Sequence, residues 1–338
     1  MIRSLYREQD GRIRTDLRPE QFSAALQDTG GLLWVDISAP ETSIEPANTC
    51  EPILCETFGF HPLAVDDALR ETHVPKVDDW GHYLYLVLHA IIVDQHDDNR
   101  LDTLELDTSE LDVFLGKNYL VTYQARPIAA VDRVWSACQR DLRYLGRGAS
   151  HLLYRLVDEL VADCMPAIEH LDEAIDWIED QVFDNPTQAL PERLFVLKRA
   201  LLRLRRVIAP QREVLNKLAR GDYDVVDADH RVFFRDVYDH LVRLHDINES
   251  LRDLVGSVLD TYLSVVNNRM NDVMKTLTIV TTLFMPLSFI SGFFGMNFFQ
   301  PTTPLDVWTG RIAFGLTLAA MFMTPIGMYL WMRKRAWT

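Results

Sequence analysis

A row of mostly polar side chains recurs along one stretch of the sequence at helical spacing. Consecutive members are separated by steps of 4, 3, 4, 7, 3, 4 and 3 residues, which keep them on one face of an α-helix. Polar groups at membrane depth are costly against lipid and normally face protein or water. This polar stripe consists of Asp260, Ser264, Asn267, Asn271, Thr278, Thr281, Met285 and Ser288.

The polar stripe has two interpretations. Neither one span nor two can enclose a channel, so the functional interpretation is a pore formed where several copies of the chain meet around the stripe. The alternative is that the Ser and Thr hydroxyls bond back to their own helix or to a second span.

The stripe runs into the first of two uncharged, apolar segments. Residues 276–305 contain no charged side chain, and the part from 276 to 294 is long enough to cross about 30 Å of hydrocarbon as a helix. A second uncharged segment covers residues 312–332. A pair of buried helices in a soluble core is the weaker explanation, so the sequence predicts a two-span membrane protein. Aromatic residues that favour the membrane interfaces flank the second segment: Trp308, Tyr329 and Trp331.

Basic residues predict the orientation of the spans. Arg333, Lys334 and Arg335 directly follow the second span, and such clusters stay in the cytoplasm. Because two spans return the chain to its starting side, residues before 275 and the tail 333–338 should both be cytoplasmic, and the loop 295–310 external. The predicted location is the inner cell membrane.

Charge and cysteine content narrow the possible partners. The 338-residue chain has 34 Lys and Arg against 49 Asp and Glu. Residues 271–338 carry five basic against two acidic side chains, a net +3, so the first 270 residues carry −18. This acidic part disfavours nucleic acid and suits cations. The four cysteines match no zinc or redox motif and are expected to be free thiols, and no signal peptide is expected at the N-terminus. The cysteines are Cys50, Cys55, Cys138 and Cys164.

The segments before the spans indicate a mixed domain followed by long helices. Apolar runs predict strands over 31–37, 82–94, 111–115 and 119–124, the last two forming a hairpin, with helix over 61–71 between them. The predicted fold is an α+β membrane protein. Its parts are an α/β domain (1–148), a helical hairpin (149–228), a stalk helix that becomes the first span (229–294), an external loop (295–310) and a second span (311–332).

Several segments together resemble the CorA family of magnesium and cobalt transport proteins. The first span contains MKTLTIVTTLFMPLSFISG and leads into Gly295-Met296-Asn297, which is similar to the family signature. Further similar segments occur in the expected order: PKVDDWGHYLYLVLH, LLYRLVDELVAD, FFRDVYDH and RKRAW. The tripeptide alone is a weak match, whereas the whole set is highly specific and leaves only about the first 55 residues without a match.

The resemblance implies a funnel-shaped homopentamer with a central pore lined by the first span. Gly295, Met296 and Asn297 match the outer selectivity loop, where neutral oxygens would hold a hydrated divalent ion; Mg²⁺ dehydrates reluctantly, so such a loop suits it. Four residues match pore-lining positions of the family: Asp260, Asn271, Leu277 and Met285. Of these, Leu277 and Met285 would form a hydrophobic constriction. Ser288, a member of the polar stripe, is added to the expected pore lining.

The resemblance also implies regulatory cation sites in the cytoplasmic part. Asp67 and Asp236 match a pair that binds regulatory Mg²⁺ between neighbouring subunits. Asp66, Asp158 and His240 lie at or beside a second, weaker site. One departure concerns the pore mouth, because only Asp306 is acidic in the segment after Asn297, where the family often has acids that attract cations.

We therefore expect a Mg²⁺ channel, also open to Co²⁺ or Ni²⁺, driven by the membrane potential and gated by cytoplasmic Mg²⁺. One alternative is a zinc transporter of the same superfamily, against which the intact Gly-Met-Asn argues. The other is a membrane-anchored sensor or scaffold, which would need no polar stripe. No triad or paired-carboxylate spacing indicates an enzyme, and no phosphate-binding motif is present.

Overall fold

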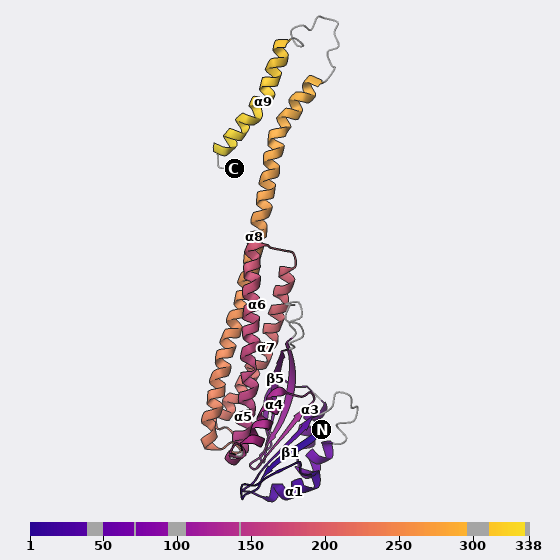
Figure 1. Cartoon of the computed structure of the whole chain (residues 1–338), viewed down its shortest axis with the longest axis vertical. Coiled ribbons are helices and arrows are strands. Elements are labelled where there is room, and N and C mark those ends of the chain that lie inside the picture. The colour runs from indigo at the N-terminus through magenta and orange to yellow at the C-terminus, as the bar shows by residue number, and fades with distance from the viewer. Residues whose placement is uncertain (39–49, 71, 94–105, 142, 296–310, 335–338) are drawn as a thin grey trace. The chain divides into compact units, whose positions relative to one another are not determined.

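The computed structural model describes residues 1–38, 50–70, 72–93, 106–141, 143–295 and 311–334 (Figure 1). The chain forms two compact units, residues 1–259 and 260–338, which are described separately. The helix α8 (Arg231–Gly295) contributes residues to both.

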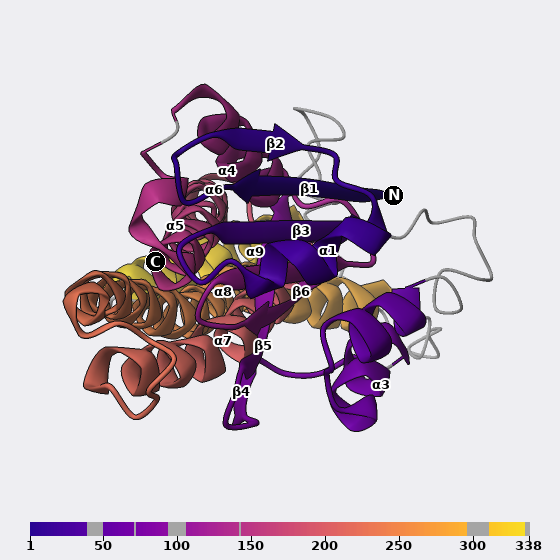
Figure 2. The ribbon, with the colours of Figure 1, turned by 90° about the horizontal axis from the view of Figure 1, so that it is seen from below.

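A seven-stranded sheet forms the base of the first unit, with the order β2-β1-β3-β7-β6-β5-β4. All neighbouring strands are antiparallel except β3 and β7, which are parallel. Figure 2 shows β2, β1 and β3 side by side. The strands are β1 (Ile2–Arg7), β2 (Ile13–Thr15), β3 (Leu32–Ser38), β4 (Lys76–Asp79), β5 (Leu84–Val93), β6 (Leu106–Leu115) and β7 (Tyr119–Gln124).

Helices cover both faces of this sheet. On one face, α1 (Pro19–Gln27), η1 (Ile53–Thr57) and α3 (Pro62–Arg70) enclose a core that includes Phe22, Leu54 and Phe60. The other face packs against α5 (Ala149–Ala162) and parts of the later helices. Because both faces are covered, consecutive residues of one strand are buried, as in β5 from Leu84 to Leu88.

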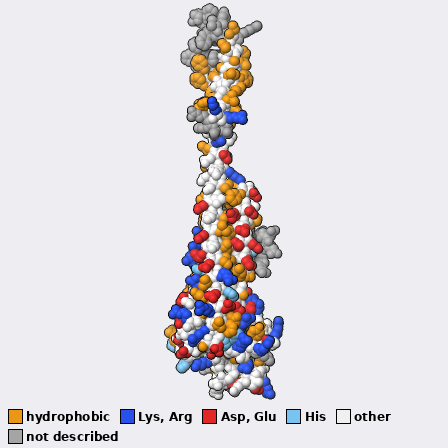
Figure 3. Space-filling view, turned by 90° about the vertical axis from the view of Figure 1, so that its left-hand side faces the viewer, with side chains coloured by type: hydrophobic (Ala, Val, Ile, Leu, Met, Phe, Trp, Pro, Cys, Tyr) orange, Lys and Arg blue, Asp and Glu red, His pale blue; other side chains and the backbone are white. Residues whose placement is uncertain are grey.

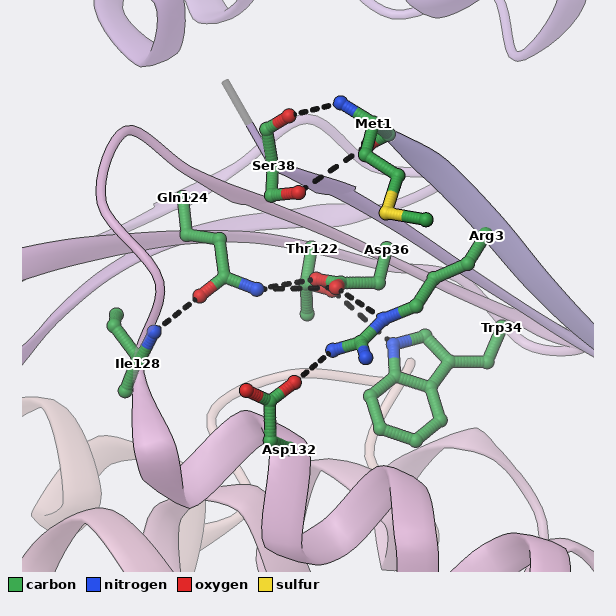
Figure 4. Close-up of polar contacts among 9 residues, drawn as sticks. All are labelled: Met1, Arg3, Trp34, Asp36, Ser38, Thr122, Gln124, Ile128 and Asp132. Carbon is green, nitrogen blue, oxygen red and sulfur yellow. Dashed lines mark hydrogen bonds and ion pairs between the residues drawn. The ribbon is translucent and has the colours of Figure 1, made fainter. Parts of the chain in front are cut away.

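A buried carboxylate ties the parallel strands β3 and β7 to strand β1 and to α4 (Ala129–Arg140) (Figure 4). Asp36 is 1% exposed and accepts hydrogen bonds from Thr122 Oγ1 at 2.6 Å, Gln124 Nε2 at 3.0 Å and Arg3 Nε at 2.8 Å. Gln124 in turn accepts the backbone N–H of Ile128, immediately before α4, at 2.7 Å. Burial raises the pKa of Asp36, and its hydrogen bonds oppose that rise.

The strand predictions agree with the structure where they were made. The predicted hairpin is confirmed, since β6 and β7 pair antiparallel with Leu115 opposite Leu120. The strands predicted over 31–37 and 82–94 correspond to β3 and β5, and the helix predicted over 61–71 corresponds to α3. Residues 71 and 94 of these predictions lie outside the described residues. Sequence patterns did not reveal β1, β2, β4, α1 or α4.

The stretch predicted as one helical hairpin contains three helices, and two short 3₁₀ turns border this region. It holds α5, α6 (Cys164–Asp184) and α7 (Leu190–Arg220), with η3 (Leu145–Arg147) before it and η4 (Ala228–His230) at its end. The break between α5 and α6 falls at Asp163. Pro166 follows three residues later, and because proline has no N–H it cannot continue the α5 ladder to Ala162. The prediction of a two-helix hairpin over 149–228 was therefore wrong in the number of helices.

The second unit consists of the rest of α8 and α9 (Arg311–Lys334). Each has a proline inside it, Pro286 and Pro325, yet both helices continue. Both are long and apolar enough to cross a membrane, and none of their most apolar windows is buried. Figure 3 shows hydrophobic side chains gathered over the upper part of these helices, with Lys and Arg side chains directly below them. The long uninterrupted helix, predicted over 229–294, is confirmed as 65 residues.

Candidate functional site

One face of α8 packs against the first unit in a strict seven-residue repeat. Its buried residues follow each other in steps of 3, 4, 3, 4, 3, 4 and 3, and all are at most 6% exposed. This repeat fixes which side of the helix packs against the rest of the first unit. The residues are Phe234, Val237, Leu241, Leu244, Asn248, Leu251, Val255 and Val258.

A second repeat on α8 is exposed throughout and is offset from the buried one by two residues. At 3.6 residues a turn, that offset is a rotation of about 200°, so the two repeats lie on nearly opposite sides of the helix. A further step of three residues from its last member reaches Asp260, the start of the polar stripe. We call these residues the upstream polar face: Asp236, Asp239, Arg243, Asp246, Ser250, Asp253 and Ser257.

The upstream polar face and the stripe share one repeating unit. An aspartate is followed four residues later by a serine that donates its hydroxyl hydrogen to the aspartate's backbone carbonyl. The bond lengths are 2.9 Å from Ser250, 3.3 Å from Ser257 and 2.9 Å from Ser264. Asn267 and Asn271 then occupy the same two positions of the repeat. The polar register is therefore continuous from the upstream polar face of α8 into the stripe.

Hydroxyls of the first span also bond back to their own helix. Thr278 Oγ1 donates to the carbonyl of Met274 at 2.7 Å, and Thr281 Oγ1 lies 3.0 Å from the carbonyl of Leu277. This is the arrangement that the alternative interpretation of the stripe expected. It does not remove the polar character of the face, because a hydroxyl that gives its hydrogen to the helix keeps lone pairs that can accept a hydrogen bond.

The register adds one residue to the stripe and leaves another beside it. Met274 fills the seven-residue gap between Asn271 and Thr278 in steps of 3 and 4, a position that the sequence argument passed over. Leu277 lies one residue before Thr278, about 100° around the helix. Asp260, Met285 and Ser288 keep the register and are exposed. At the end of α8, Gly295 is the last helical residue, whereas Met296 and Asn297 lie outside the described residues.

The first predicted cytoplasmic surface is on α3. Oδ2 of Asp67 lies 2.6 Å from Nζ of Lys76 and 3.7 Å from Nε2 of His73. The neighbouring Asp66 pairs with Arg70 one turn along the same helix. Both acids are thus paired with cations of the same chain.

The second predicted surface is formed by α5 and α8. Asp158 accepts a 3.0 Å bond from Arg155, and its environment includes the charges of Asp236 and His240. Burial raises the pKa of Asp158, and Asp236 adds to that rise, while Arg155 and His240 oppose it. Asp236 and His240 are exposed, one helical turn apart on α8.

Asp158, Asp236 and His240 lie near one another, whereas Asp67 lies on α3, which Figures 1 and 2 show apart from α8. Among the described residues, no group of three His, Cys, Asp or Glu side chains is placed to hold a metal ion. A site that uses both Asp67 and Asp236 would therefore need a second copy of the chain. Lys76, which the sequence argument missed, could not have been found from spacing, because it lies nine residues from Asp67 on a different element.

An α/β domain, two long apolar helices and a continuous polar face on one of them are the features of a membrane protein with a polar helix face. The family of CorA-like Mg²⁺ transporter proteins matches residues 29–334. The cobalt/magnesium transport protein CorA of Thermotoga maritima is 34% identical over 318 residues, covering 92% of this chain and 85% of that protein. The chain belongs to the CorA family. It is thus a member of a family of transporters, and the expectation that it is not an enzyme is confirmed.

Solved structures show the same fold. The complete structure of the CorA magnesium transporter from Methanocaldococcus jannaschii matches with a TM-score of 0.79 at 21% identity, covering 99% of this chain and 98% of that chain. The ZntB cytoplasmic domain from Vibrio parahaemolyticus matches with a TM-score of 0.58 at 14% identity, covering 79% of this chain and 98% of that chain. At these identities the likeness concerns the fold alone, so it does not favour the zinc alternative.

Proposed function

We propose that the chain forms a homopentameric channel that admits Mg²⁺, together with Co²⁺ and Ni²⁺, into the cytoplasm. The observation that carries this proposal is the continuous polar face of α8, which lies opposite the face held by its own subunit. Copies that place this face around a common axis enclose a polar path. An anchor for a sensor or scaffold would need no such face.

In this pore the ion moves with much of its water. Asn271 and Ser288 present neutral oxygens, which exchange hydration water without binding the ion tightly, and Asp260 supplies a carboxylate ring at the cytoplasmic end of the stripe. Leu277 and Met285 form the hydrophobic constriction; the register indicates that Met274 contributes as well. Gly295, Met296 and Asn297 form the outer loop that selects the hydrated ion.

The membrane potential drives uptake. A divalent ion gains roughly 4.6 kcal/mol on crossing 100 mV, so the channel needs no nucleotide. The basic residues at the end of α9, Arg333 and Lys334, favour placing both termini in the cytoplasm of a cell whose inner membrane holds the protein. The acidic first unit then faces the compartment into which the cation is delivered.

Cytoplasmic Mg²⁺ closes the channel from a site shared by two subunits. Asp67 of one subunit and Asp236 of its neighbour hold the ion, with Asp66, Asp158 and His240 forming a weaker site nearby. The placement of Asp67 and Asp236 on separate surfaces of one chain supports this arrangement. An ion that binds the closed arrangement better than the open one shifts the population toward closure.

Asn267 and Asn268 provide a matched test of the pore. They are consecutive, identical and both exposed, but only Asn267 lies in the polar register. Mg²⁺ flux into liposomes should fall at least about tenfold in Asn267→Leu, because an apolar ring replaces a polar one in the path. Asn268→Leu should retain the wild-type flux. Equal effects of the two substitutions at equal protein would contradict the proposed pore face.

A further inference from the structure

Lys76, the first residue of β4, holds the Asp67 carboxylate within the same subunit. Its ammonium lies 2.6 Å from Oδ2 of Asp67, 3.1 Å from Oδ2 of Asp78 and 5.3 Å from the centre of the Tyr85 ring. The side chains of Lys76 and Asp67 are 27% and 29% exposed, so both are partly shielded from water. Two carboxylates and one aromatic face thus surround a single ammonium group.

The surroundings keep Lys76 positively charged. Burial by itself would lower the pKa of Lys76, but the hydrogen bonds and charges of Asp67 and Asp78 outweigh burial, and the pKa is raised. At neutral pH, a metal ion that approaches Asp67 therefore meets an ammonium already bound there.

We propose that Lys76 is a built-in competitor for the regulatory cation. In the metal-free protein it neutralises Asp67, and a divalent ion closes the channel only by taking that carboxylate from the ammonium. This inference rests on the regulatory role proposed above for Asp67, and it adds a residue that sets which cations can use the site and at what concentration.

The competition discriminates by charge. A monovalent ion brings no more charge to Asp67 than the ammonium that it must displace, whereas a divalent ion brings twice as much. The ammonium is also attached to the chain next to the carboxylate, so it competes without a loss of translational freedom. Lys76 should therefore keep K⁺ from occupying the site while Mg²⁺ still can, and it should weaken Mg²⁺ binding in doing so.

The test uses the full chain and three variants. Lys76→Met removes the charge and keeps most of the stem, whereas Lys76→Arg keeps the charge. Arg12→Met is the matched control, since Arg12 is 81% exposed in the turn between β1 and β2, by the opposite edge of the sheet from β4. Channel current is recorded against cytoplasmic Mg²⁺ at constant ionic strength.

Lys76→Met should lower the half-inhibiting Mg²⁺ concentration by about tenfold, because a like charge beside the ion has been removed. Lys76→Arg and Arg12→Met should stay close to wild type. A second readout is the rate of proteolysis of the protein in detergent, compared between K⁺ and N-methylglucamine at the same ionic strength. Lys76→Met should be cleaved more slowly in K⁺ than in N-methylglucamine. The wild type should be cleaved equally fast in both.

Asp67→Asn separates this inference from the proposed regulation. If Asp67→Asn loses Mg²⁺ inhibition while Lys76→Met keeps the wild-type half-inhibiting concentration, the competitor role of Lys76 is wrong and the regulatory site stands. If Asp67→Asn keeps wild-type inhibition, the proposed regulatory role of Asp67 is wrong, and the competitor role of Lys76, which depends on it, is wrong as well. A Lys76→Met channel that needs more Mg²⁺ for closure would also overturn the inference.

Discussion

The hydroxyl of Ser264 donates a 2.9 Å hydrogen bond to the backbone carbonyl of Asp260, one helical turn earlier. The serine oxygen therefore keeps its lone pairs for partners outside the helix, on the same face as the aspartate side chain. The same bond recurs at seven-residue intervals from Ser250 and Ser257. At these three positions the serine side chain offers acceptors rather than a donor, which favours cations and their hydration water.

The outer loop supplies the first prediction. Asn297→Ala and Gly295→Ala should each abolish Mg²⁺ uptake into liposomes while the purified oligomer stays intact by size-exclusion chromatography. The reason is that the loop is proposed to recognise the ion and not to hold the subunits together. Gln300→Ala, which removes an amide three residues later, is the control and should retain flux. Wild-type flux from the Asn297 variant would remove that residue from the selectivity loop.

Closure by cytoplasmic Mg²⁺ should depend on Asp67 and Asp236. The double variant Asp67→Asn, Asp236→Asn should stay conductive at Mg²⁺ concentrations that close the wild type, with the half-inhibiting concentration raised at least about tenfold. Patch-clamp current against internal Mg²⁺ measures this directly.

Removing acids also relieves repulsion between subunits, so the gating experiment needs a charge-matched control. Asp172→Asn with Asp176→Asn removes the same charge from the exposed face of α6. That control should close at the wild-type concentration. If both double variants shift alike, general electrostatics and not a bound ion explains the effect.

The Asp36 network should contribute strongly to the stability of the first unit. Asp36→Ala leaves Arg3, Thr122 and Gln124 without their shared acceptor and should lower the free energy of unfolding by about 3 kcal/mol. Asp10→Ala removes one partner of an exposed pair with Arg12 and should cost less than about 1 kcal/mol. Denaturant unfolding followed by tryptophan fluorescence compares the two; similar losses would contradict the role of burial.

His151 should make the first unit sensitive to acid. Burial lowers the pKa of His151 to about 4, and the charges of Arg147, His230 and Arg155 act in the same direction. The unfolded chain takes up this proton near its ordinary pKa of about 6.5, before the folded chain does. Stability should therefore be lost as the pH falls from about 6.5 to about 4, by up to about 3 kcal/mol from this group.

His151→Phe tests that pH dependence, because it keeps a ring among the neighbouring rings of Tyr154 and Phe233 and cannot be protonated. The variant should lose less stability than the wild type between pH 7 and pH 5 in denaturant unfolding. His170→Gln on the exposed face of α6 is the control and should follow the wild type. An unchanged pH dependence in His151→Phe would assign the acid sensitivity to other groups.

The sequence by itself was enough to predict the features that depend on local periodicity. Two uncharged segments indicated the spans, and steps of three and four residues indicated the stripe from Asp260 to Ser288, because the period of a helix is the same wherever the helix lies. The repeat of Asp246, Asp253 and Asp260 is equally visible in the sequence and could have extended the stripe upstream.

Only the tertiary structure decided which distant residues meet. Asp67 on α3 and Lys76 on β4 come together only in the folded chain, and nothing in a spacing of nine residues requires that. Likewise, Asp36 contacts Thr122 because β3 and β7 pair in parallel, across 86 residues of chain. Such pairings depend on the packing of whole elements into one core, which minimises exposed apolar surface over the full chain, and no local pattern encodes that minimum.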